Sequence, residues 1–235
     1  RYVNYVIYNS YKAQNNHLAF GYKNERSIVI PNGFELDKFC FNPESKTKIR
    51  EKLNIKKGEI VFITVGRWDI QKDYYTLIKA LCEFKKYNID FKMLMCGRNL
   101  DYKNKELLSL IEKYRLKKHM VLLGRQEDIP ALLSCADVYI SSSLGESFSN
   151  SIGEAMACEL PCVVTDVGDS KLIMGDTGVI VKAKDYVALS RAMLKCVTDN
   201  NLLRKGLAAR KRIMKNYDIR AIVGLYEKKY EELIN

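Results

Sequence analysis

Short apolar runs alternate with helical patterns along most of this 235-residue chain. Six runs rich in β-branched residues have the length of buried strands, at residues 59–66, 91–97, 120–124, 137–143, 161–166 and 177–182. Amphipathic helical patterns lie between them, at residues 73–87, 104–118, 128–136, 149–158 and 168–174. Strands that are apolar throughout and joined by helices pair in parallel beneath helices on both faces. The alternation therefore predicts an α/β fold with a Rossmann-like, doubly wound parallel sheet.

The two ends of the chain have a different organisation. Helical patterns at 185–199, 201–216 and 218–234 follow the last expected strand, whereas the start has two short apolar runs, a helical pattern and a polar stretch. The chain begins without Met in what has the pattern of a strand, so we expect a fragment of a longer protein. We predict that residues 1–46 are the tail of a preceding domain with its linker, residues 47–216 the main domain and residues 217–235 a closing helix.

Composition narrows the possible partners without choosing among them. The formal net charge of +11 favours a polyanion, an anionic membrane surface or a phosphate-bearing substrate, although a lysine-rich solvated surface explains most of the lysines. No run approaches the roughly 18 to 20 apolar residues of a membrane span. The seven cysteines are odd in number and form no C-x-x-C pair, which is typical of reduced thiols in a cytosolic protein. With only two histidines, we expect no metal site.

The loop after the strand at 59–66 carries two cations. It reads GRWDIQKD, which is neither a dinucleotide fingerprint nor a P-loop. Arg67 and Lys72 beside a tight turn at Gly66 could clamp a diphosphate, the arginine through its forked guanidinium and the lysine as a point charge. Taken alone, the two residues are explained equally well as surface side chains that precede a helix.

The stretch GESFSNSIGEAMACELP, at residues 145–161, carries two glutamates. If it were all helix, Glu146 and Glu154 would lie about 12 Å apart along the axis, too far to share one proton or one metal. Glu146 is expected in the loop and Glu154 in the following helix, where it could also form a capping box with Ser151. Small residues would let backbone amides at the helix start approach an anion closely: Ser147, Ser149, Asn150 and Gly153.

Taken together, these motifs resemble glycosyltransferase family 4, whose GT-B fold has two Rossmann-like domains. The resemblance covers nearly the whole chain and rests on GRWDIQK, GRQEDIPALLSCADVYISSS and GESFSNSIGEAMACELPCVVTDVGDSKLIMGDTGVIV. Its most specific element is the pair of glutamates separated by seven residues. It implies that the chain is the C-terminal half of a GT-B glycosyltransferase, the nucleotide-sugar-binding half, preceded by the end of the acceptor domain.

The resemblance also implies roles for individual residues. Glu154 would hold the ribose hydroxyls of the donor and Glu146 the hydroxyls of its sugar, while Arg67 and Lys72 would neutralise the leaving diphosphate. The catalytic set is then Glu146, Arg67 and Lys72. The base would lie at the loop after residue 124, and the sugar and phosphate would meet amides at the start of the later helix. The other donor-binding positions are Gly66, Arg125, Gln126, Ile129, Ser147, Phe148, Ser149 and Asn150.

The implied reaction is a retaining transfer from a nucleoside-diphosphate sugar, of UDP or GDP type, to a glycan or lipid-linked acceptor in surface polysaccharide or glycoconjugate synthesis. We expect neither a cofactor nor a metal, and a cytoplasmic protein that can associate peripherally with the inner membrane face. The fragment would bind donor but transfer little. Its first thirty residues would leave a strand edge free to pair with another copy.

Two alternatives stay open. A sugar phosphorylase or a disaccharide synthase has the same fold, and the missing domain would decide between these activities. A non-catalytic binder of polyanions or nucleic acid is motivated only by the charge, and we expect no nucleic-acid partner.

Three positions depart from the family pattern, which commonly has glycine where this chain has Asp73, Ser149 and Glu159. If residue 159 requires a left-handed backbone, the glutamate costs about 1 kcal/mol.

Overall fold

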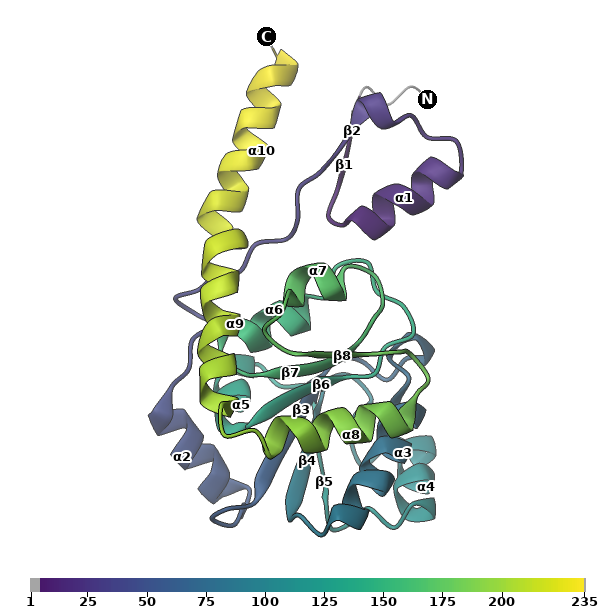
Figure 1. The fold of residues 1–235 in the computed structure, drawn as a ribbon, viewed down its shortest axis with the longest axis vertical. Helices are drawn as coiled ribbons and strands as arrows, with labels where there is room; N and C mark the ends of the chain where they lie inside the picture. The colour runs from purple at the N-terminus through teal and green to yellow at the C-terminus, as the bar shows by residue number, and fades with distance from the viewer. Residues whose placement is uncertain (1–4, 235) are drawn as a thin grey trace.

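A six-stranded parallel sheet forms the centre of the computed structural model, which describes residues 5–234. Its strands lie in the order β5 (Met120–Gly124), β4 (Phe91–Cys96), β3 (Ile60–Val65), β6 (Val138–Ser141), β7 (Cys162–Thr165) and β8 (Val179–Val181). Every neighbouring pair is parallel, and the order runs outward from β3 in both directions (Figure 1). The predicted Rossmann-like, doubly wound α/β fold is confirmed.

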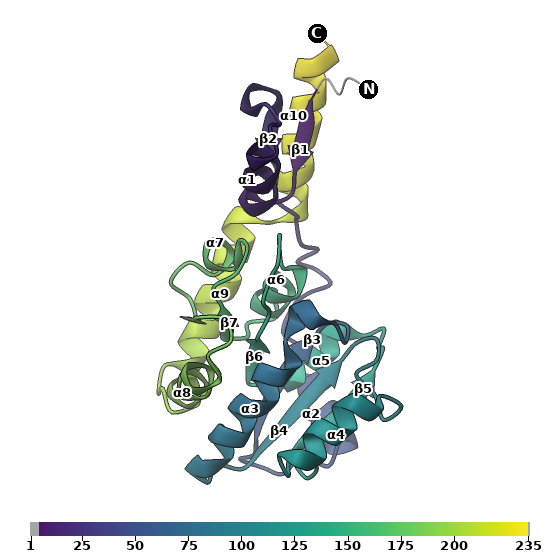
Figure 2. The same cartoon turned by 90° about the vertical axis from the view of Figure 1, so that its right-hand side faces the viewer.

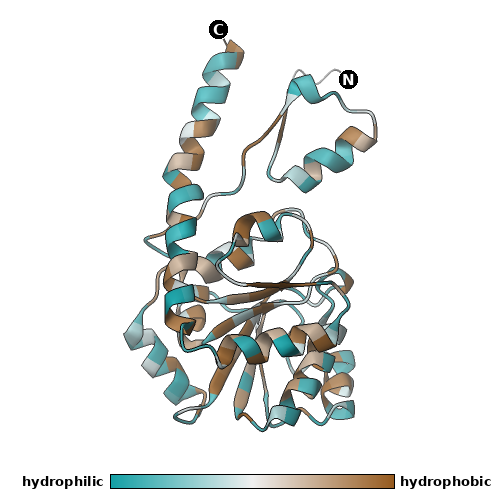
Figure 3. Ribbon diagram, in the orientation of Figure 1, coloured by the Kyte–Doolittle hydropathy of each residue, from teal (hydrophilic) through white to brown (hydrophobic). Residues whose placement is uncertain are grey.

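Helices cover both faces of the sheet. One hydrophobic cluster joins the sheet to α3 (Tyr74–Phe84), α4 (Lys105–Lys113) and α8 (Tyr186–Val197). The other joins it to α2 (Pro43–Lys52), α5 (Ile129–Cys135), α6 (Asn150–Ala157), α7 (Ser170–Met174) and α9 (Leu202–Asn216). Because both faces are covered, every residue of β6 and β7 is buried, which is why these strands read as continuous apolar runs in the sequence (Figure 3).

The sequence-based expectation included no helix at α2; it assigned residues 43–46 to the polar linker and placed residues 47–52 in the main domain without an element. Asn42 caps it by accepting a hydrogen bond from the Ser45 N–H (2.9 Å), and Pro43 occupies its first position. An asparagine before a proline is a helix-start signal that the polar composition obscured. Arg50 anchors the helix to the domain through Asp137, with 2.5 Å between nitrogen and oxygen. The expected domain boundary between residues 46 and 47 therefore falls inside a continuous helix.

The first described residues form a small β-α-β unit. Strands β1 (Val6–Tyr8) and β2 (Ser27–Val29) pair in parallel, joined by α1 (Tyr11–Ala19) and a short 3₁₀ turn at Asn24–Arg26. The last helix, α10 (Ile219–Ile234), extends beside this unit, and both stand out from the same end of the sheet domain (Figures 1 and 2).

Two backbone hydrogen bonds hold the linker, which we define as residues 30–42 between β2 and α2, against the start of α10. The Phe34 N–H donates to the Tyr217 carbonyl (2.8 Å), and the Ile219 N–H donates to the Phe34 carbonyl (3.1 Å). Farther along α10, the Lys229 ammonium lies 4.2 Å from the centroid of the Tyr5 ring. Within residues 5–234, none of the helices combines the length and the hydropathy that crossing a membrane demands.

Two of the three departures from the family's glycines have left-handed backbone. Glu159 has φ of 63° and Asp73 has φ of 44°. Asp73 recovers part of the conformational cost because its carboxylate caps α3 by accepting the Thr76 N–H (3.2 Å). Within residues 5–234, the Glu159 carboxylate has a single ionic contact, a 3.9 Å approach to Arg210. Glutamate at position 159 is therefore the departure with least compensation.

Replacing Glu159 by glycine should stabilise the fold by about 1 kcal/mol, because glycine adopts the left-handed conformation without a Cβ penalty. Urea unfolding would measure the change. Glu159→Ala removes the same carboxylate but keeps the Cβ atom, so it should give no gain, and Asp73→Gly should give none because it loses the cap. Equal gains from glycine and alanine at position 159 would contradict the backbone explanation.

Candidate functional site

Two loops meet at the carboxyl edge of the sheet, where β3 and β6 are neighbours. We call residues 66–73, after β3, the first loop and residues 142–149, after β6, the second loop. The Leu144 N–H donates to the Gln71 carbonyl (2.7 Å), and the Ser142 hydroxyl donates to two carbonyls of the first loop. These bonds join chain segments that lie about 70 residues apart in sequence. These hydrogen bonds hold the two loops against each other.

A half-buried ion pair lies where the loops meet. The Lys72 ammonium is 2.5 Å from Glu146 Oε1, and the Ser143 hydroxyl donates to the same oxygen (2.7 Å). The two charged side chains retain 21% and 13% of their exposure, so water weakens their attraction less than at an open surface. The structure thus brings together two of the three residues expected to be catalytic.

Arg67, the third of them, is held by a different partner. Its Nε donates to Asp69 Oδ2 (3.0 Å), and 57% of the arginine side chain remains exposed. The bond from the Gln71 N–H, and after it the one from Arg67, lower the pKa of Asp69. Sequence reasoning missed Asp69, although an aspartate two residues after an arginine is a signal for such a contact.

Two glycines, Gly66 and Gly97, let the backbone after β3 pass close to the backbone after β4. The Gly66 N–H donates to the Cys96 carbonyl (2.9 Å), and a Cβ on Gly97 would lie 1.6 Å from the Gly66 carbonyl oxygen. Trp68, the chain's only tryptophan, stacks on Tyr74 with ring centroids 5.5 Å apart. Since it follows Arg67 directly, its fluorescence should report on ligands that bind to the first loop.

Helix α6 begins at Asn150, so the capping-box alternative is wrong. Glu154 is the fifth residue of the helix and Ser151 already lies inside it. The Ser151 hydroxyl instead accepts a hydrogen bond from Tyr139 (2.8 Å). Ser149 occupies the N-cap position without a side-chain capping bond. The Ser149 side chain therefore does not occupy the amides at the start of α6. An anion-binding helix start needs such amides to be available.

Phe148 and Gly153 both pack against Phe34 of the linker. The Phe148 ring is buried against Phe34 and Tyr217, with centroids 6.1 and 5.8 Å away, so only its backbone can face a ligand. Gly153 was expected to make room for an anion. The structure corrects this expectation, because a Cβ on Gly153 would lie 2.0 Å from the Phe34 ring.

Glu154 faces the linker and α10. It lines a hollow of about 570 Å³ together with residues of α6, the linker and α10, including Asn150, Asn32, Lys38, Ile219 and Tyr226. Burial raises the pKa of Glu154, and the positive charge of Lys38 partly opposes that effect. The hollow includes neither Lys72 nor Glu146 in its lining, so the two glutamates have separate surroundings.

The loop expected to hold the base is exposed. Arg125 and Gln126 follow β5, and Gln126 donates to the Leu123 carbonyl (2.7 Å), whereas Ile129 begins α5 and packs on the core. A second hollow of about 520 Å³ lies beside this loop and shares Lys38 with the first hollow. Its lining adds neighbours that sequence reasoning did not select, Glu127, Asp128 and Pro130.

A match to a protein-family model identifies the family of this chain. The model of the family described as glycosyl transferases group 1 matches residues 45–216, which is most of the chain. The chain belongs to the group 1 glycosyltransferases. The matched segment begins within α2 and ends at the last residue of α9, so it contains both loops and α6.

Curated relatives of this chain agree with that assignment. It is 30% identical over 201 residues to the UDP-Gal:alpha-D-GlcNAc-diphosphoundecaprenol alpha-1,3-galactosyltransferase of Escherichia coli, covering 81% of this chain and 50% of that protein. It is 24% identical over 202 residues to the N-acetyl-alpha-D-glucosaminyl L-malate synthase of Bacillus anthracis, covering 85% and 52%. The chain thus spans about half the length of these curated relatives.

Solved structures share its fold. Anabaena Alr3699/HepE in complex with UDP-glucose superposes with a TM-score of 0.91 at 23% identity, covering 99% of this chain and 65% of that one. A glycosyltransferase from Rickettsia africae ESF-5 superposes with a TM-score of 0.90 at 22% identity, covering 99% and 64%. These structures support the GT-B type of fold. Among residues 5–234, no three His, Cys, Asp or Glu side chains gather closely enough to hold a metal ion.

Glu154→Gln should stabilise the folded chain at neutral pH. The raised pKa of Glu154 means that the folded state disfavours the ionised carboxylate, so wild-type stability falls as pH rises through 4.5 toward the folded pKa. The advantage of glutamine should therefore be present at pH 7 and vanish below about pH 4. Melting temperatures of both proteins across this range would test it. Glu51→Gln, at an exposed glutamate of α2, serves as the matched control and should show no such trend.

Proposed function

We propose that this chain is the donor-binding part of a retaining glycosyltransferase. It would take a sugar from a nucleoside-diphosphate sugar, of UDP or GDP type, and serve its transfer to a glycan or lipid-linked acceptor in surface polysaccharide or glycoconjugate synthesis. The observation that carries the proposal is the Lys72–Glu146 pair, held where the two loops meet. A cation and a carboxylate at this edge match two parts of a nucleotide sugar, its diphosphate and the hydroxyls of its sugar.

The ion pair suggests how the donor would be received. A diphosphate offers Lys72 more negative charge than one carboxylate does, so it can replace Glu146 as the partner of the ammonium. The released Glu146 can then accept hydrogen bonds from sugar hydroxyls. Arg67, which is mostly exposed, can turn from Asp69 to the same diphosphate. As the bond between sugar and phosphate breaks, these cations would stabilise the charge growing on the leaving group.

The stereochemical outcome depends on which group attacks the sugar. Glu146 accepts the Ser143 hydroxyl and, once released by Lys72, would accept sugar hydroxyls, so we give it the task of holding the sugar rather than attacking it. The leaving phosphate would instead assist the acceptor on the same face of the sugar, which retains the anomeric configuration. The start of α6 adds partial positive charge near this phosphate.

Glu154 and the loop after β5 would take the nucleoside. A carboxylate can accept both vicinal hydroxyls of a ribose, and Glu154 faces a hollow that meets the hollow beside residues 127–130 at Lys38. A partly buried acid kept at a cost in stability is typical of a functional position. We therefore place the ribose at Glu154 and the base near Arg125, Gln126 and Ile129.

We also propose the class of acceptor and the location in the cell. The Escherichia coli relative is named for a diphosphoundecaprenol-linked acceptor, which supports a lipid-linked acceptor and peripheral association with the cytoplasmic membrane face here too. The net charge of +11 is compatible with an anionic leaflet. We propose that residues outside this chain bind the acceptor, so the chain by itself would transfer little. Light scattering would measure the expected pairing of copies through β1 and β2.

Nucleotide binding tests the proposal directly. UDP or GDP should change Trp68 fluorescence, and Arg67→Ala, Lys72→Ala or Glu154→Ala should each weaken binding by roughly tenfold to a hundredfold, the loss of one charge-assisted hydrogen bond. Calorimetry with UDP, GDP, ADP and a DNA duplex gives the affinities.

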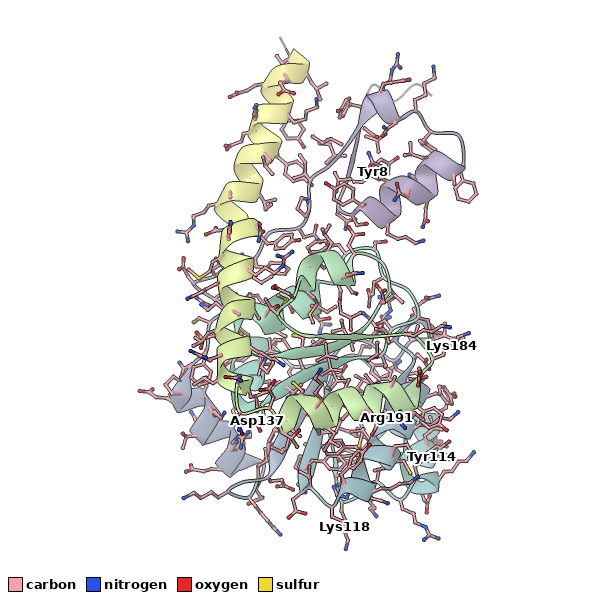
Figure 4. The ribbon with its side chains drawn as sticks, in the orientation of Figure 1. Tyr8, Tyr114, Lys118, Asp137, Lys184 and Arg191 are labelled. Atoms are coloured by element: carbon pink, nitrogen blue, oxygen red, sulfur yellow. The ribbon has the colours of Figure 1, made fainter. Side chains whose placement is uncertain are left out.

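Matched controls are available far from the loops. Lys118 lies just before β5, at the edge of the sheet opposite the two loops, and Arg191 is an exposed residue in the middle of α8 (Figure 4). Replacement of either by alanine should leave the affinity unchanged. Nucleotide affinity that Lys72→Ala and Glu154→Ala do not alter would refute the proposed site. Salt-sensitive binding of DNA in place of nucleotide would support the polyanion binder instead.

We also propose that donor binding needs no metal ion, because Arg67 and Lys72 supply the positive charge that a divalent cation would otherwise bring. The nucleotide dissociation constant should stay within about twofold when EDTA replaces Mg²⁺ or Mn²⁺. An affinity that falls in EDTA and recovers with added cation would contradict this proposal.

A further inference from the structure

Asp169 connects the small N-terminal unit to the sheet domain. It lies between β7 and α7 and is 7% exposed. One carboxylate oxygen accepts the Tyr11 N–H (2.8 Å) and the other accepts the Lys12 N–H (3.0 Å). These amides belong to the first two residues of α1, and the next amide, of Ala13, bonds to the Ser10 hydroxyl (3.1 Å). The start of α1 is therefore capped jointly by its own serine and by the other part of the molecule.

The same residue also touches the second loop. The Asp169 N–H donates to the Ser147 carbonyl (3.1 Å). Its neighbour Gly168 has φ of 56°, and a Cβ there would lie 2.2 Å from the Glu146 carbonyl oxygen. The Gly168–Asp169 turn thus lies directly against the backbone of the loop that carries Glu146.

The N-terminus of α1 balances the negative charge of Asp169. Among the ion pairs within residues 5–234, none includes this carboxylate. A helix N-terminus carries partial positive charge, and two backbone N–H groups aimed at one carboxylate make charge-assisted hydrogen bonds. Separating α1 from Asp169 would leave two helix amides without partners and a carboxylate without its donors.

We infer that Asp169 is a positioning residue that couples the second loop to the N-terminal unit. This inference rests on the proposed function, in which the donor sugar and diphosphate meet that loop. Ordering of the loop by donor would be transmitted through the Ser147–Asp169 backbone bond to the carboxylate that holds α1. The N-terminal unit would then be held most firmly when donor is bound.

Amide hydrogen exchange can observe the contact at single residues. As the first two helical positions, Tyr11 and Lys12 have no acceptor within α1, so their protection reports the bonds to Asp169. Asp169→Ala should accelerate their exchange by roughly tenfold to a hundredfold, as expected for the loss of a charged acceptor. The milder Asp169→Asn should accelerate it less. The Gln14 amide, which bonds to the Ser10 carbonyl within the unit, is the internal reference.

A matched variant removes a similar cap elsewhere. Asp185 caps α8 by accepting the Ala188 N–H (2.8 Å), so Asp185→Ala should leave Tyr11 and Lys12 unchanged. Exchange at Tyr11 and Lys12 that is the same in wild type, Asp169→Asn and Asp169→Ala would overturn the inferred contact.

Added UDP tests the coupling and separates it from the proposed function. Exchange at Tyr11 and Lys12 should slow in wild type when UDP binds, whereas Asp169→Ala should still bind UDP, by Trp68 fluorescence, without any slowing. UDP that binds wild type and leaves both amides unaffected overturns the coupling and spares the proposed function. Failure of every nucleotide to bind overturns the proposed function and the coupling together. Amide exchange measured without nucleotide still tests the contact between Asp169 and α1 in that case.

Discussion

The ion pair between Lys72 and Glu146 is the interaction on which the site depends. It joins a loop that follows β3 to a loop that follows β6, and Ser143 supports the same carboxylate oxygen. Removing either charge would leave the other half-buried without its counter-charge, which is costly, whereas an incoming ligand can supply a replacement. The pair therefore keeps a cation and an acid ready at one place. This arrangement suits a ligand that carries both a diphosphate and hydroxyl groups.

Packing places that pair relative to the rest of the molecule. Phe34 from the linker lies over Gly153 of α6 and packs with Phe148 and Tyr217. The linker, the second loop and the junction of α9 and α10 thus share one aromatic cluster. Because these side chains are buried, movement of the linker would disturb the backbone beside Glu146. Asp169 adds a polar connection between that backbone and α1, so apolar and polar contacts converge on the second loop.

The elements of the sheet domain could be predicted because each buried element leaves a periodic pattern. Strands covered on both faces read as continuous apolar runs, and helices read as amphipathic ones. Helix α2 escaped because its sequence is polar, and its cap and its bond to Asp137 are what hold it. The family's glycine at position 159 raised the question of a left-handed backbone there, and the structure has one. The expected role of Gly153 was wrong because its packing partner, Phe34, lies far away in sequence.

Sequence by itself determined the fold class, the order of the elements, the two loops that carry Arg67, Lys72 and Glu146, and the helix that carries Glu154. These follow from local periodicity and from motifs of contiguous residues. Tertiary structure alone decided that Lys72 pairs with Glu146, that Arg67 turns to Asp69 and that Glu154 faces the linker. It also decided that Asp169 caps a helix more than 150 residues away. Such contacts depend on which strands become neighbours and on side-chain directions after packing, and neither leaves a local pattern in the chain.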